Sequence, residues 1–169
     1  YLAAHFGIAL SYAQFINPVG GAEAIKLYKE RFKPSEQLST AQTNVGIFAF
    51  CSEDEEKVMK AKALMGYRFL SFENGNYNRS FSYEDIKDYK YSEREKQRLE
   101  YHRNRFIAGT PDVVKQKFTE LAENLDTDEI VVATFSETKE DRLHSYELLA
   151  DIFLNKNENT KQQILSHHC

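Results

Sequence analysis

The chain has 169 residues, which is the length of one ordinary domain, and its 41% hydrophobic residues, with 13% aromatics, are enough to build a core. A formal net charge of -4 and the lack of a long basic run argue against a nucleic-acid partner. No stretch approaches the roughly eighteen apolar residues of a membrane span, and no positively charged leader opens the chain, so we expect a soluble, cytoplasmic protein.

The cysteines and the C-terminal histidines predict neither a disulfide framework nor a metal site. Cys51 and Cys169 are the only cysteines, which fits a reduced compartment. His167, His168 and Cys169 carry metal-binding atoms, but three neighbouring ligands on a polar tail have poor geometry for a structural site. We therefore expect no metal and interpret residues 155–169 as a polar tail.

The opening sequence YLAAHFG is typical of a last helical turn that ends at Gly7. The chain has no initiator methionine, and a chain that begins within a helix is expected to be a piece of something longer.

Three short segments are almost continuously apolar: residues 7–15 (GIALSYAQF), 44–51 (NVGIFAFC) and 129–135 (EIVVATF). Runs that are apolar on both faces are typical of parallel strands covered by helices. Each run is followed by a helical pattern, and this repeated alternation predicts an α/β fold with a parallel sheet.

The three helical patterns have start, stop and core signals of their own. Pro34 ends the first, Ser52 is a good N-cap for the second before four acidic residues, and Ser136 can cap the third. The predicted buried positions are, in chain order, Ala24, Ile25, Tyr28, Phe32, Met59, Ala63, Leu64, Leu143, Tyr146, Leu149, Ile152 and Phe153.

Residues 66–108 form a long, charged and aromatic-rich insertion before the final unit. Ser82 is a plausible N-cap within it, with Asp85 three residues on as the capping partner. A connection of this length is usually a lid, a binding loop or disordered, and its aromatics favour packing, either on protein or on a ligand.

The stretch FIAGTPDVVKQKF (106–118) combines glycine, threonine and proline in an order that a phosphate-binding loop might use. Thr110 followed by Pro111 is also ordinary helix-start chemistry, and Asp112 would repel an anion. We interpret the stretch as a helix start whose free amides remain only a generic anion site.

Three stretches in this order resemble the C-terminal part of the bacterial luciferase-like, flavin-dependent monooxygenases: FGIALSYAQFIN with AIKLYKERFKPS, NVGIFAFCSEDEEKV, and GTPDVVKQKFTELAENLDTDEIVVATFSETKEDRLHSYELLADIF. The family members are (β/α)8 barrels. The resemblance implies that residues 1–169 are a single partial domain, holding about the last three β/α units of a TIM barrel with the 66–108 insertion. A complete barrel needs about 250 residues.

The resemblance also implies a cofactor and a chemistry. In the family, reduced FMN from a separate reductase lies at the C-terminal mouth of the barrel, where O2 and the flavin oxidise an aldehyde or another small organic substrate. No catalytic side chain is assigned here. The family's main phosphate-binding serine is expected upstream of Tyr1.

The candidate cofactor-binding residues are Tyr12, Gln14 and Asn17, at or just past the end of the first strand. Gln14 matches the family position beside the flavin ring; the alternative is a polar residue that merely ends a strand. At the end of the second strand, Cys51 and Ser52 could touch a substrate, although helix capping by Ser52 is the simpler role.

The remaining features separate the alternatives. Five histidines are scattered along the chain (His5, His102, His144, His167 and His168), and surface roles are expected for His5 and His144. Partners would be flavin, a small-molecule substrate, and a missing N-terminal half or another protein chain, with a homo-oligomer expected.

A second hypothesis is a non-catalytic truncated barrel that self-associates or binds a partner, since three strands leave open sheet edges. A third, a stand-alone nucleotide-binding domain, is disfavoured because Gly20 and Gly21 lack the spacing of known phosphate loops.

Overall fold

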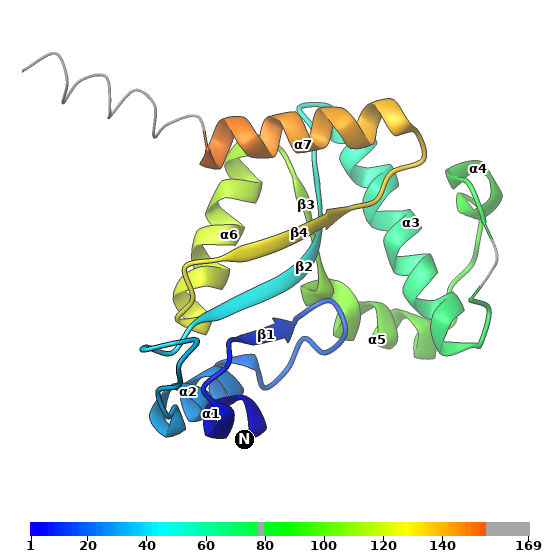
Figure 1. Cartoon of the computed structure of the whole chain (residues 1–169). Coiled ribbons are helices and arrows are strands. Elements are labelled where there is room, and N and C mark those ends of the chain that lie inside the picture. The colour runs from blue at the N-terminus through cyan, green and yellow to red at the C-terminus, as the bar shows by residue number, and fades with distance from the viewer. Residues whose placement is uncertain (78–79, 155–169) are drawn as a thin grey trace, which may run out of the picture.

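The computed structural model describes residues 1–77 and 80–154 (Figure 1). Within these ranges one sheet contains four strands: β1 (Leu10–Ala13), β2 (Thr43–Cys51), β3 (Phe106–Gly109) and β4 (Ile130–Thr134). Every strand pair is parallel, so the predicted α/β fold with a parallel sheet is confirmed. The tail proposed for 155–169, with His167, His168 and Cys169, lies outside the described residues.

Helices surround the sheet and connect its strands. They are α1 (Leu2–Phe6), α2 (Gly21–Arg31), α3 (Glu55–Glu73), α4 (Tyr83–Ile86), α5 (Glu93–His102), the short 3-10 helix η1 (Arg103–Arg105), α6 (Pro111–Leu125) and α7 (Lys139–Phe153). As the sequence predicts, α1 ends at Gly7, which has the left-handed conformation. None of the helices in the described ranges is long and apolar enough to cross a membrane.

Strand β2 organises the sheet because it pairs with all three other strands. Residues 43–46 pair with β1, 48–51 pair with β3, and 45–49 pair with β4. Since residues 45–46 pair with both β1 and β4, and residues 48–49 with both β3 and β4, β1 and β3 share one edge of β2. They lie end to end along it, and β4 occupies the other edge.

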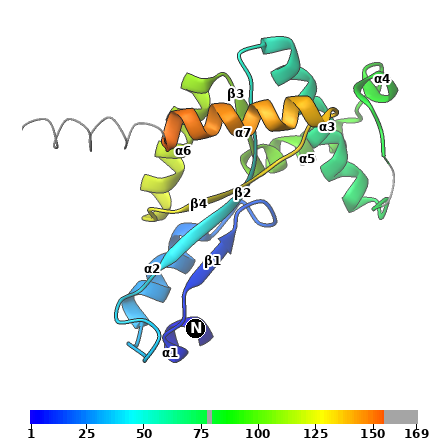
Figure 2. The same cartoon turned by 45° about the horizontal axis from the view of Figure 1, so that its top comes forward.

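The odd-numbered residues of β2 face the helices. Ile47, Ala49 and Cys51 pack against α6 and α7, and Val45 packs against α2 and α6. Helix α3 contributes a separate cluster around Phe50 on the opposite face. Figures 1 and 2 show α6 and α3 on opposite sides of β3, and both helices pack against that strand.

The other face of the sheet is only partly covered. The register places Ser11 beside Asn44, and Gly46 beside Val131. Ser11 is exposed and Val131 is 50% exposed, while the Asn44 Oδ1 atom is inaccessible but has no hydrogen-bond partner within the described residues. Parallel sheets are usually covered on both faces. The composition of this face is therefore that of a surface that another part of a structure covers.

Two of the predicted helix caps are wrong. Helix α3 is capped by Asp54, whose Oδ1 accepts from the backbone N–H groups of Glu56 and Lys57, while Ser52 accepts from the Asp54 N–H. Helix α7 is likewise capped by Thr138 and not by Ser136. In both places the chain takes one more turn before the helix begins, so the residue that directly follows the strand forms that turn. The predicted Ser82 cap with Asp85 is confirmed.

The buried residues of α3 and α7 also differ from the prediction. Leu143 is 51% exposed and Met59 is largely exposed, contrary to the prediction, as are Tyr146 and Phe153 in part. Val58 and Ser145 are buried instead. Because Ser145 Oγ accepts from the buried Cys51 N–H at 2.9 Å, a hydrogen bond fixes the face that α7 presents to β2.

The boundaries of the insertion also differ from the prediction. Helix α3 continues to Glu73, so its last two turns belong to a regular helix and not to a loop. At the other end, residues 106–109 form β3, which the sequence interpretation took as part of a helix start. The helix start at Pro111, after Thr110, is confirmed.

We predict that Ser145→Ala lowers the free energy of unfolding by about 1–3 kcal/mol, because it leaves the buried Cys51 N–H without an acceptor. Urea unfolding followed by circular dichroism measures the change. The exposed Ser39→Ala variant is the control and should remain within about 0.5 kcal/mol of the parent. Equal stability of the two variants would contradict the proposed role of this hydrogen bond.

Candidate functional site

The residues predicted to bind the cofactor lie in β1 (Tyr12) and in the loop that follows it (Gln14 and Asn17), and their side chains have different environments. Tyr12 faces the helices: its ring packs closely against Gly21 at the start of α2. Its hydroxyl shares its proton between the carbonyl oxygens of Asn17 and Val19, each 2.8 Å away. The Asn17 Oδ1 atom accepts from the Val19 N–H. Tyr12 and Asn17 therefore shape the loop after β1.

Gln14 is the member of the set that reaches a cavity. Its side chain is buried, with 7% exposed, and its Nε2 donates to the carbonyl oxygens of Pro18 and Asn104 at 3.4 and 3.3 Å. Its Oε1 atom has no hydrogen bond to any described residue, so one acceptor at the end of β1 remains free.

The cavity beside Gln14, which we call cavity 1, has a volume of about 810 Å³. It lies between α6 on one side and α3 with α5 on the other, along the free edge of β3. Its wall is mostly apolar, and its charged lining residues are Glu23, Lys62, Arg103, Lys117 and Glu120. The apolar lining includes Ile47, Met65, Phe69, Leu99, Phe106, Ile107 and Leu121. Ligand pockets for small molecules have this size and this mixture of side chains.

A set of polar contacts fastens the insertion to the loop after β1. The Arg105 Nε donates to the Phe15 carbonyl oxygen at 2.6 Å, and its guanidinium lies 4.1 Å from the centre of the Phe69 ring. A second guanidinium nitrogen is 2.9 Å from His102 Nδ1. Since arginine can only donate, His102 Nδ1 is the acceptor and its Nε2 carries the hydrogen.

His102 is buried, with 2% exposed. Its Nε2 lies 3.0 Å from Glu73 Oε1, although this contact does not meet the angular requirements of a hydrogen bond. We interpret it as an electrostatic contact. Burial lowers the pKa of His102 despite the nearby carboxylate, which favours the neutral ring. No helical pattern of apolar residues surrounds His102 in the sequence, so nothing there indicated its burial.

Glu73 is held by two residues of α5. Arg98 forms an ion pair with it through two nitrogens, and this interaction, with a smaller contribution from His102, lowers the pKa of Glu73 to about 2. Glu73, His102 and Arg105 thus form a continuous chain of polar contacts from the end of α3 to the end of β1. We call this set of polar contacts the clamp.

Four phenylalanines gather above the carboxyl ends of β1, β2 and β4. The Phe48 ring centre lies 4.8 Å from the ring centres of both Phe15 and Phe135, and 6.4 Å from that of Phe69. Phe135 is partly exposed and also contacts the Arg68 guanidinium, 5.2 Å from its ring centre. The strand ends therefore meet at an aromatic surface with two arginines at its border.

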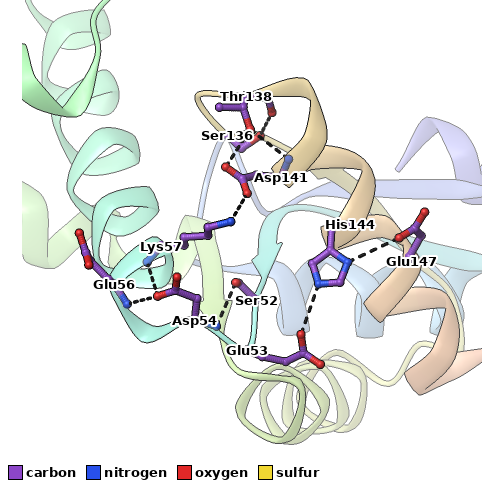
Figure 3. A network of polar contacts seen from close by, with 10 residues as sticks. All are labelled: Ser52, Glu53, Asp54, Glu56, Lys57, Ser136, Thr138, Asp141, His144 and Glu147. Carbon is purple, nitrogen blue, oxygen red and sulfur yellow. Dashed lines mark hydrogen bonds and ion pairs between the residues drawn. The ribbon is translucent and has the colours of Figure 1, made fainter.

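A second cavity, cavity 2, has a volume of about 550 Å³ and lies beyond the ends of β2 and β4. Figure 3 shows part of its wall: Lys57 of α3 reaches Asp141 of α7 at 2.6 Å, and Asp141 also accepts from the Thr138 hydroxyl. The same contacts lower the pKa of Asp141. In the same view, His144 lies 3.3 Å from Glu53 and 3.5 Å from Glu147.

Cys51 and Ser52 are both buried. Burial raises the pKa of the Cys51 thiol to about 11, so the thiolate is not populated at neutral pH and the residue acts as core. Among the residues in the described ranges, no group of three or more His, Cys, Asp or Glu side chains could hold a metal ion.

Comparison with known proteins gives relatives without an assigned activity and solved structures with the same fold. No family model matches the chain. It is 37% identical to the uncharacterized protein YwcH and 33% identical to the uncharacterized protein YceB, both of Bacillus subtilis strain 168. About 90% of the chain aligns with each, but it spans only 46% of either relative, so it covers about half their length.

Two crystal structures share the fold. Apo-MsnO8 superimposes with a TM-score of 0.78 at 24% identity, over 89% of this chain and 46% of that one. The monooxygenase RslO1 from Streptomyces bottropensis superimposes with a TM-score of 0.58 at 18% identity, over 92% of this chain and 44% of that one. The described fold thus corresponds to slightly less than half of each larger protein.

The clamp predicts a stability loss in acid. Because the pKa of Glu73 is lowered, its contribution is complete above the ordinary value of 4.5 and disappears as pH falls toward about 2. Because the pKa of His102 is also lowered, the unfolded chain takes up its proton first, and stability declines as pH falls below the ordinary value of 6.5. Urea unfolding between pH 7 and pH 3 measures both losses.

Glu73→Gln should cost about 1 kcal/mol at pH 7, a modest value because about a third of the Glu73 side chain is exposed to screening solvent. The variant should also lose less stability than the parent between pH 4.5 and pH 3. Glu123→Gln, an exposed change on α6, should follow the parent profile. A Glu73→Gln profile parallel to that of the parent below pH 4.5 would refute the assignment.

Proposed function

We propose that the chain is part of an FMN-dependent, luciferase-like monooxygenase that uses reduced flavin and O2 to oxidise an aldehyde or another small organic substrate. The observation that carries the proposal is the position of Gln14. It directly follows β1, at the place where the motif resemblance expects a flavin contact, and it lines cavity 1. The fold shared with the monooxygenase RslO1 supports the same chemistry.

The sheet supports the idea of a partial barrel. Strands β1 and β4 each have an edge without a partner strand in the described ranges, and the face that holds Ser11 and Val131 is partly uncovered. Additional strands of a (β/α)8 barrel would pair with these edges and close this face. The length of the relatives, about twice that of this chain, supplies enough residues for them.

Cavity 1 has a donor and acceptor set that fits FMN. The free Oε1 of Gln14 can accept from an N–H group of a flavin ring, and Phe69 and Met65 offer an apolar wall. Three basic residues of the lining, Lys62, Arg103 and Lys117, can contact a phosphate, against two acidic ones, Glu23 and Glu120. When bound, reduced FMN supplies the electrons that activate O2. The chain would supply the rest: Gln14 orients the ring, the apolar wall excludes water, and Tyr12 with Asn17 holds the loop that positions Gln14.

The proposal predicts that the chain quenches FMN fluorescence on titration and that Gln14→Leu weakens FMN binding about tenfold, as the loss of one buried hydrogen bond would. Gln37→Leu is the matched control, because Gln37 is exposed on a distant loop, and it should bind as the parent does. YwcH, tested in parallel, shows whether the longer chain binds more tightly. Equal FMN affinity of the parent and Gln14→Leu would remove Gln14 from the site.

Activity is a separate test. Reduced FMN, O2 and a series of aldehydes, added to the chain and to YwcH, should give the corresponding carboxylic acids, with one reduced FMN and one O2 consumed for each acid formed. Free reduced FMN also consumes O2, so the acid is measured and not O2. If both proteins bind flavin but neither oxidises an aldehyde, the monooxygenase hypothesis is rejected and a flavin-binding module remains.

The uncovered sheet face also favours the second hypothesis, a non-catalytic module that acts through self-association or a partner. On this reading the chain should elute above its monomer mass of 19.6 kDa in light-scattering chromatography, because copies would cover one another's apolar face. Val131→Lys, which charges the exposed centre of that face, should shift it toward the monomer. A cooperative, 19.6 kDa monomer at all concentrations would contradict self-association.

A further inference from the structure

Cavity 2 is separated from cavity 1 by α3, and the flavin proposal does not use it. It lies where β2 and β4 end, between α3, α4 and the start of α7. Three of its basic side chains come from one stripe of α3, since Lys57, Lys60 and Arg68 follow helical spacing with Leu64 between them. The charged groups of this stripe therefore face the partly apolar cavity 2 and not only bulk solvent.

These three cations are not equivalent. Lys57 is paired with Asp141, and Lys60 is paired with Glu56 at 2.7 Å. Arg68 forms no ion pair with any residue that the structure describes. Its guanidinium lies 5.2 Å from the centre of the Phe135 ring and 5.8 Å from that of Phe81. Aromatic rings hold a guanidinium in place without neutralising its charge, so Arg68 retains its capacity for a bidentate anion contact.

The acidic side chains of the cavity already have partners. Asp141 contacts Lys57 and Thr138, Asp85 accepts from the N–H and hydroxyl of Ser82, and Glu137 accepts from the Tyr83 N–H at 2.8 Å. These contacts hold the carboxylates against helix starts at the border of the cavity. The free cation is thus the group best placed to meet a ligand.

The apolar side of the cavity decides what kind of anion fits. Phe50, Leu64 and Met65 line it together with the rings that flank Arg68. A bare inorganic anion would leave this surface in contact with water, whereas an organic acid would cover it. We infer that cavity 2 binds a small organic acid, with its carboxylate on Arg68 and its apolar body against Phe50, Leu64 and Met65.

Benzoate is a suitable probe because it combines a carboxylate with a compact apolar ring. Isothermal titration and NMR of the Arg68 Nε–H group should show benzoate binding, with at least tenfold weaker binding in Arg68→Met. Arg68→Lys keeps the charge but not the planar fork, so it should fall between the two. If Arg68→Lys is folded, its weaker benzoate binding cannot be attributed to loss of the fold.

Two comparisons make the result decisive. Benzamide, the neutral analogue, should bind at least tenfold more weakly than benzoate, and inorganic phosphate should bind more weakly still. Arg31→Met is the matched control, because Arg31 also lies over an aromatic ring, that of Tyr1, far from the cavity. Its affinity should equal that of the parent.

Four outcomes would overturn the inference. Equal binding of benzamide and benzoate would show that charge plays no part, and phosphate binding as tight as benzoate would show that the apolar body plays none. Unchanged benzoate affinity in Arg68→Met, or an equal loss in Arg31→Met, would show that Arg68 is not the receiving group.

Discussion

The arrangement of this molecule depends on one constraint, the sharing of a single edge of β2 by two strands. Nine residues of β2 accommodate β1 along their first half and β3 along their second half. Strand β1 must therefore stop at Ala13, where the edge passes to β3. The chain leaves the sheet there, with the Phe15 N–H donating to the Gly46 carbonyl as it turns. The exit from β1 and the entrance to β3 consequently meet in space although about ninety residues separate them.

At that meeting point the end of the insertion contacts the loop after β1. Asn104 and Arg105 directly precede β3, and they provide the carbonyl and guanidinium that contact Gln14 and Phe15. Arg105 is partly buried, and burial lowers its pKa from the ordinary value, a cost that its contacts with the Phe15 carbonyl, the Phe69 ring and His102 offset. A long insertion fastened in this way at its end can border a cavity instead of moving over it.

The sequence predicted what depends on local periodicity and missed what depends on distant contacts. Apolar runs located β1, β2 and β4, and Gly7, Ser82 and Pro111 marked helix boundaries correctly, because these signals act within a few residues. The apolar run at β3 covers only residues 106–109, whereas the run around β1 covers 7–15, so β3 gave no strand pattern, and it pairs where β2 offers it an edge. His102 is buried by Phe69, Glu73 and Arg105, whose proximity only the folded chain creates. The environment of Gln14 was likewise hidden, since Asn104 lies ninety residues away.

Helix α3 then determines how the two cavities relate. Met65 lines both of them, whereas Gly66 and Phe69 face only cavity 1, and Leu64 and Arg68 face only cavity 2. A rotation of α3 about its axis would move side chains out of one cavity and into the other. Contacts at the two ends oppose such a rotation.

At the start of α3, Asp54 caps the helix and Lys57 pairs with α7. Toward its end, Gly66 allows α5 to approach, since a Cβ atom there would lie 2.9 Å from Leu99. A larger residue at Gly66 would require the Leu99 side chain to move, in the contact between the two helices that Glu73 and His102 also connect. The shapes of the two cavities are therefore coupled through the packing of one helix.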